Sequence, residues 1–114
     1  MQTSIQTKSF LFAKRIVNLC KFLKAEQKEF VMSKQLLRAG TSIGANVAES
    51  QQAQSRADFV NKLNIALKEA YETNYWLRLL HETDCLTHKQ FASIFNDCNE
   101  LERLLISIVK STKE

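Results

Sequence analysis

The sequence predicts an all-α protein that folds as one antiparallel, up-down-up-down bundle of four helices. Three observations support this prediction. The 114 residues include no proline and only two glycines, so the turn residues that an all-β fold needs are missing. Four segments repeat apolar residues every three or four positions, which is the period of a helix. Short polar stretches separate these segments, and short connections favour antiparallel neighbours.

The first helix is predicted over Ser4–Ala25, because apolar residues recur there at spacings of four, three and four. These residues are Phe12, Ile16, Leu19 and Leu23. The second helix is predicted over Phe30–Gln52, where small residues fill the centre of the segment. Gly40 and Gly44 each cost about 1 kcal/mol of helix propensity relative to alanine. Close approach of a neighbouring helix would offset that cost.

The third helix is predicted over Arg56–Glu82, after Ser55 and Asp58 in a Ser-x-x-Asp capping pattern. Thr87 and Gln90 repeat the pattern as Thr-x-x-Gln and open the fourth helix, which extends nearly to the C-terminus. The fourth apolar seam alternates spacings of three and four and consists of Phe91, Ile94, Cys98, Leu101, Leu105 and Ile108.

The chain is predicted to be a single domain over residues 1–114, and a cytoplasmic one. No stretch approaches the roughly 18 apolar residues of a membrane span. The first ten residues, MQTSIQTKSF, lack the basic-then-apolar order of a signal peptide. The three cysteines are odd in number and form no Cys-x-x-Cys pair, so we expect reduced thiols.

Basic residues are concentrated in the first half of the chain. Residues 1–57 carry nine Lys/Arg and three Asp/Glu, a net charge of +6, whereas residues 58–114 carry seven and nine, a net charge of −2. A basic segment of this kind permits binding to nucleic acid or another acidic partner. The candidate phosphate-binding residues all lie in or just after the first helix: Lys14, Arg15, Lys21, Lys24 and Lys28.

Patterns typical of enzymes and metal sites are incomplete. The stretch from Gly40 to Gly44 matches Gly-x-Ser-x-Gly, the nucleophile elbow of α/β-hydrolases, but no strand precedes it. It continues with Ala-Asn rather than the Lys-Ser/Thr of a phosphate loop. No Glu-x-x-His pair exists for a di-metal site in a bundle. We therefore expect no enzyme activity, no metal and no cofactor.

Two further groups of side chains could either organise the fold or bind something. A polar line on the second predicted helix and two glutamates on the third suggest a network that fixes helix register; ligand binding is the alternative. This polar network consists of Arg38, Ser42, Asn46, Glu49, Glu69 and Glu72. A second group is aromatic and consists of Tyr71, Tyr75 and Trp76. We expect these side chains to pack in the core; the alternative is that they contact another subunit or nucleic-acid bases. The broad apolar surface of the first helix favours a homo-oligomer.

One segment has a specific family resemblance. The residues from Ser33 to Ser50, SKQLLRAGTSIGANVAES, resemble the signature of four-helix bundle proteins encoded within intervening sequences of bacterial 23S rRNA genes. The resemblance continues through the third helix, including Asp58-Phe59, Lys68-Glu69-Ala70 and Tyr75-Trp76-Leu77, and covers essentially the whole chain. It implies a left-handed bundle assembled as a ring-like homopentamer. It also implies similarity to the accessory variability protein of diversity-generating retroelements, which binds nucleic acid and a reverse transcriptase.

Together, these observations lead us to expect a non-enzymatic, oligomeric bundle that contacts RNA or DNA through its basic surface, without base-specific readout. The alternative is an adaptor that recognises a protein partner, such as a reverse transcriptase, and has no role with nucleic acid.

Overall fold

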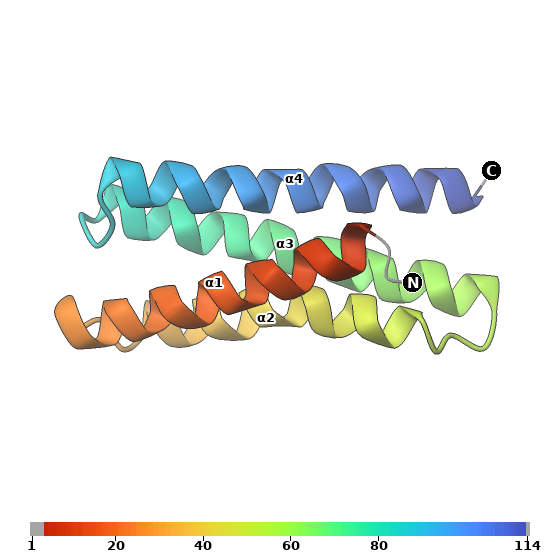
Figure 1. Cartoon of the computed structure of the whole chain (residues 1–114), viewed down its shortest axis with the longest axis horizontal. Coiled ribbons are helices and arrows are strands. Elements are labelled where there is room, and N and C mark those ends of the chain that lie inside the picture. The colour runs from red at the N-terminus through yellow and green to blue at the C-terminus, as the bar shows by residue number, and fades with distance from the viewer. Residues whose placement is uncertain (1–3, 114) are drawn as a thin grey trace.

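The computed structural model describes residues 4–113, and this part of the chain is all-α with no strand. The four-helix prediction is confirmed. In Figure 1 the helices lie roughly parallel to one long axis and alternate in direction. The elements are α1 Ser4–Glu26, α2 Met32–Ser50, α3 Arg56–Glu82 and α4 His88–Lys113.

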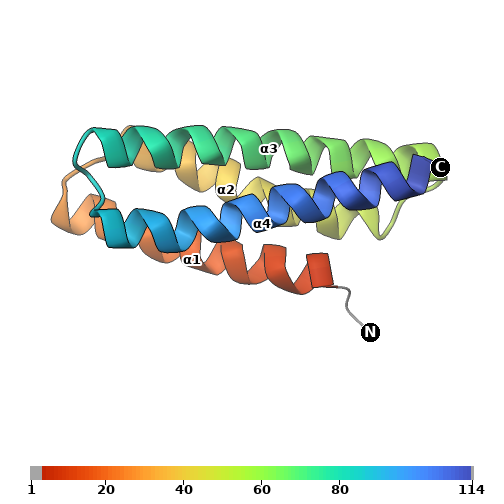
Figure 2. The same cartoon turned by 90° about the horizontal axis from the view of Figure 1, so that it is seen from above.

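The helices follow one another around the bundle, so that each packs on its neighbours in the sequence. Contacts are extensive between α1 and α2, between α2 and α3, and between α3 and α4. The remaining neighbours, α1 and α4, touch much less. Figure 2 shows why: the two helices diverge toward the N-terminal end of α1. The result is a rod of 44 × 23 × 20 Å with one loosely closed side. Among the described residues, no helix is long and apolar enough to cross a membrane.

Helix α2 is two residues shorter at each end than the sequence predicts, and its N-terminal cap explains where it begins. The Glu29 carboxylate accepts hydrogen bonds from the backbone N–H groups of Met32 (3.0 Å) and Ser33 (3.1 Å). Lys28, just before this cap, has a left-handed backbone with φ of 54°. Phe30 and Val31 consequently lie outside any helix and are exposed.

The predicted caps of α3 and α4 are both present. Ser55 Oγ accepts from the Asp58 N–H at 3.0 Å, while the Asp58 carboxylate accepts from the N–H of Gln54 rather than that of Ser55. Thr87 and Gln90 form a reciprocal capping box, with N···O distances of 2.9 and 3.1 Å. These caps satisfy N–H groups that the first turn of a helix leaves without intrahelical partners.

The core is apolar and includes two of the three free cysteines. Its largest buried side chains on the first two helices are Phe12, Ile16, Leu23, Leu36 and Ile43, and those on the last two are Leu63, Leu77, Leu80, Leu101 and Leu105. Burial raises the pKa of the Cys20 thiol to about 11 and that of Cys98 further still. Both thiols are therefore protonated and unreactive at neutral pH.

The two glycines of α2 allow α1 to approach closely, as the sequence predicts. A Cβ atom added to Gly40 would lie 2.7 Å from Cγ1 of the buried Ile16. At Gly44 it would lie 3.2 Å from the backbone oxygen of Ser9. The Ile16 side chain at Gly40 and the Ser9 backbone at Gly44 thus occupy the space that a side chain on α2 would need.

Replacing Gly40 by alanine tests this contact. The substitution gains about 1 kcal/mol of helix propensity, but it forces Ile16 and the two helices apart. We expect Gly40→Ala to destabilise the protein by about 1–3 kcal/mol, measured by urea unfolding. In a protein that already carries Ile16→Ala, the clashing atoms are gone. Gly40→Ala should then lower the stability of the protein much less, or raise it. An increase in stability from Gly40→Ala alone would show that the packing of α1 on α2 does not require glycine at this position.

Candidate nucleic-acid interface

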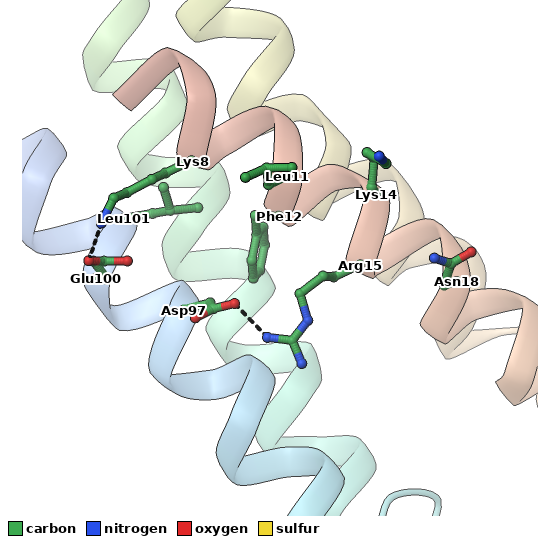
Figure 3. A pocket seen from close by; sticks show the side chains of 9 residues that line it. All are labelled: Lys8, Leu11, Phe12, Lys14, Arg15, Asn18, Asp97, Glu100 and Leu101. Carbon is green, nitrogen blue, oxygen red and sulfur yellow. Dashed lines mark hydrogen bonds and ion pairs between the residues drawn. The ribbon is translucent and has the colours of Figure 1, made fainter. Parts of the chain in front are cut away.

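The loosely closed side of the bundle contains a groove between α1 and α4. Its first hollow has a volume of about 500 Å³ and is shown in Figure 3. Leu11, Phe12 and Leu101 form its apolar lining. Its polar lining consists of Lys8, Lys14, Arg15, Asn18, Asp97 and Glu100. One of the predicted phosphate-binding residues, Arg15, points from α1 toward α4 across this hollow.

A second hollow of about 530 Å³ continues the groove toward the α3–α4 connection. The two hollows share Arg15 and Asn18, so they form one feature along the bundle. The rest of the second lining is Leu19, Phe22, Lys89, Gln90, Ser93 and Ile94. Lys89, on α4, adds an exposed cation that the sequence analysis did not include.

Two ion pairs cross the groove and neutralise part of its charge. Arg15 Nη1 lies 2.5 Å from Asp97 Oδ2, and its Nη2 donates to Ser93 Oγ at 2.9 Å. Lys8 Nζ lies 2.6 Å from Glu100 Oε2. Figure 3 shows both pairs bridging the helices. Arg15 is thus held by α4 and contributes no net positive charge at this point of the surface.

The other four predicted phosphate-binding residues are in a different situation. Lys14, Lys21, Lys24 and Lys28 are all exposed. Within residues 4–113, none of them forms an ion pair with a carboxylate. Lys14 lines the groove but points away from Asp97 and Glu100 in Figure 3. We refer to these four lysines as the α1 lysines.

The structure brings three of the α1 lysines onto one surface of α1 and places the fourth just beyond it. Lys14, Lys21 and Lys24 are related by helical spacings of seven and three, which put side chains on a common face. Lys28 follows the end of α1 at Glu26, and its Nζ donates to the backbone oxygen of Ala25 at 2.9 Å. That bond holds the Lys28 ammonium against the last turn of α1.

Part of the predicted polar network joins α2 to α3. Arg38 donates to Glu69 at 3.0 Å and also pairs with Glu72. Glu72 accepts a further hydrogen bond from the Trp76 indole N–H at 3.1 Å. The bond with Arg38, followed by that with Trp76, holds the pKa of the Glu72 carboxyl below its usual value. The pKa of Arg38 is raised, chiefly by the same bond.

The rest of that network does not connect the two helices in the same way. Ser42 Oγ donates to the Arg38 backbone oxygen at 2.6 Å, and Asn46 Nδ2 donates to the Ser42 backbone oxygen at 2.8 Å. Both side chains therefore bond to the preceding turn of their own helix, as short polar side chains in helices often do. Glu49 instead approaches Lys62 of α3 at 3.5 Å. The six residues contribute to three ion pairs between α2 and α3, at two separate places, and to two hydrogen bonds within α2.

The Gly-x-Ser-x-Gly stretch is helical throughout, because residues 40–44 lie in the middle of α2. His81 and His88 lie at the α3–α4 connection, where the His81 ring stacks on Phe91 with centroids 4.2 Å apart. The described residues contain no group of three or more His, Cys, Asp or Glu side chains placed to hold a metal ion.

Comparison with known proteins identifies the family. Residues 1–107 match the family described as 23S rRNA-intervening sequence protein. The chain belongs to this family. None of the curated proteins compared with it is similar.

A solved structure supports the same fold for this intervening-sequence protein. It is the crystal structure of a protein with unknown function from the S23 ribosomal protein family of Bacteroides thetaiotaomicron VPI-5482. The two chains are 67% identical and match with a TM-score of 0.92, over 93% of this chain and 98% of the other.

The contact of Arg38 with Glu72 should make the stability of this intervening-sequence protein depend on pH. The folded-state pKa of Glu72 is lowered, so its carboxylate stabilises the fold above the unfolded value of about 4.3. That contribution is lost as the pH falls through the folded-state pKa. We expect Glu72→Gln to cost no more than about 1 kcal/mol near neutral pH, because the pair is partly exposed. Urea unfolding at several pH values should show a smaller loss of stability in acid for this variant.

Glu82→Gln provides the control, because Glu82 is exposed and lies in none of the ion pairs of residues 4–113. It should keep the acid sensitivity of the unmodified protein. Equal acid sensitivity in Glu72→Gln and the unmodified protein would contradict the role assigned to Glu72.

Proposed function

We propose that this protein is a non-enzymatic, self-associating scaffold that binds RNA through the phosphate backbone. The observation that carries the proposal is the set of α1 lysines, which are exposed and form no ion pair within the described part of the chain, whereas Lys8 and Arg15 are paired across the groove. The ammonium groups of Lys14, Lys21 and Lys24 can exchange counterions and water for a phosphate without first breaking an ion pair, whereas Lys28 would release its bond to the Ala25 backbone oxygen. Membership in a family described by an rRNA intervening sequence supports RNA as the partner to test first.

The arrangement favours binding to the backbone rather than to particular bases. Lys14 to Lys24 spans ten residues of helix, a length of about 15 Å. Lysine is a mobile point charge, and contacts of lysine with phosphate carry no sequence information directly. We therefore expect affinity that depends steeply on salt and weakly on sequence.

Exposed apolar side chains support self-association. Phe10 is 67% exposed and Val31 is 76% exposed; Leu11 and Phe30, beside them in the sequence, are also exposed. Large exposed apolar side chains of this kind are typical of contact surfaces when they gather in one region. They form two separate apolar patches: Phe10 and Leu11 lie near the start of α1, and Phe30 and Val31 lie in the connection beyond its other end. Self-association would repeat the α1 lysines and raise the affinity for a long RNA.

Charge reversal on α1 tests the proposal. We expect Lys14→Glu/Lys21→Glu to weaken RNA binding at least tenfold at low salt and to reduce the dependence of log Kd on log salt. The matched control is Arg56→Glu/Lys110→Glu, which changes the net charge equally at two exposed residues of α3 and α4 that take part in none of the ion pairs of residues 4–113. Fluorescence anisotropy with a labelled RNA, between about 50 and 200 mM salt, measures both quantities.

Several results would refute the nucleic-acid function. One is binding by the unmodified protein that does not change with salt, and another is equal weakening by the α1 variant and its control. If no RNA is bound at all, the adaptor function takes precedence, with a protein partner to be sought on the same exposed surfaces.

A further inference from the structure

The outer face of α3 carries a stripe of exposed basic and aromatic side chains. Lys68, Tyr71, Tyr75 and Arg78 follow one another at spacings of three, four and three, so they share one face of the helix. All four are exposed, and each tyrosine retains 50% of its accessible surface. We call these residues the α3 stripe.

Tyr75 of the α3 stripe is held by a ring contact without being buried. Tyr75 contacts Trp76 edge to face, with ring centroids 5.1 Å apart and planes at 77°. Trp76 is in turn held by its hydrogen bond to Glu72. Side chains four residues apart on a helix have Cβ atoms about 5–6 Å apart. Tyr71 and Tyr75 therefore present two neighbouring aromatic surfaces to the solvent.

Charges of both signs flank the α3 stripe, and the carboxylates nearest to it are engaged by other side chains. Glu72 and Glu69, on the side of α3 facing α2, are bound by Arg38. On the side facing α4, Asn74 joins Arg78 to Glu102: Arg78 Nε donates to Asn74 Oδ1 at 2.8 Å, and Asn74 Nδ2 donates to Glu102 at 3.2 Å.

Glu102 is partly buried and accepts hydrogen bonds from Asn74 and Cys98. Burial raises the pKa of its carboxyl, against the opposing effects of its hydrogen bonds and of the nearby Arg103 and Arg78. Arg103, the next residue on α4, is exposed. A polyanion approaching the α3 stripe thus meets cations on both sides of the two tyrosines.

We infer that the α3 stripe binds single-stranded nucleic acid, with unpaired bases stacked on Tyr71 and Tyr75 and phosphates held by Lys68 and Arg78. Aromatic platforms lined by basic residues are the usual means of binding single strands without sequence preference. A duplex cannot use the tyrosines in this way, because its bases are already stacked on one another. The inference rests on the proposed function, and it adds that the protein prefers unpaired strands to duplexes.

The stripe is a surface distinct from the α1 lysines. Across the described residues, α1 contacts α2 and α4 but not α3, so α1 and α3 are diagonal in the bundle. Figures 1 and 2 agree with this order of the helices. Variants on α1 and α3 can therefore be examined independently.

The experiment compares two double variants with the unmodified protein. Tyr71→Leu/Tyr75→Leu keeps apolar bulk and helix propensity but removes the aromatic rings. Tyr71→Phe/Tyr75→Phe keeps the rings and removes only the hydroxyl groups. The probes are an unstructured oligouridine RNA of about 12 nucleotides and an RNA duplex of similar length, compared by anisotropy at one salt concentration. Circular dichroism and solution mass verify that each variant folds and assembles normally.

We expect the leucine variant to lose about tenfold or more in affinity for oligouridine, with little change for the duplex. The phenylalanine variant should bind both RNAs as the unmodified protein does. Ultraviolet irradiation of the unmodified complex should cross-link uridine to Tyr71 or Tyr75.

Different failures have different meanings. If the unmodified protein binds neither RNA, this inference and the proposed function both fail. If it binds RNA through the α1 lysines but the leucine variant is unaffected, or loses affinity for both RNAs equally, only this inference fails. A reduced solution mass for the leucine variant would assign the stripe to a contact between copies and would likewise overturn the inference.

Discussion

The close packing of α1 on α2 determines where every other surface of this protein lies. Gly40 leaves room for the buried Ile16 side chain, and Gly44 lets the Ser9 backbone approach α2 directly. Because α1 is fastened to α2, it can diverge from α4 without losing its core contacts. The α1–α4 groove and the outward direction of the lysines on α1 both follow from this attachment.

Ion pairing then divides the charges of the protein into two classes. Arg15, Lys8 and Arg38 are each bound to carboxylates of a neighbouring helix and serve mainly to hold helices together. The α1 lysines are not paired in this way, so their charge remains available to a partner. A net charge of +4 would be unremarkable if it were spread evenly. Its concentration on α1, where the lysines form no ion pair with the acidic residues that the structure describes, is what makes a polyanion a suitable partner.

The sequence predicts the helices well because their apolar period and caps are local features. It predicts the length of α2 less well, because Glu29 caps this helix from within a stretch that is itself polar and helix-compatible. Arg15 could not be separated from the lysines by sequence, since its partner Asp97 is 82 residues away. The groove was also beyond sequence reasoning, because it depends on the angle between two helices distant in the chain. In the sequence, Tyr71 and Tyr75 look like aromatic residues of the core. Only the structure shows that both side chains are exposed.

The central claim is that several copies of the bundle together bind RNA by electrostatic attraction. The most direct test is the solution mass by light scattering after size-exclusion chromatography, with and without a structured RNA at low salt. The account predicts a mass that is a multiple of the 13.1 kDa chain, increased by RNA and restored when salt is raised. A 13.1 kDa monomer whose mass is unchanged by RNA would contradict it.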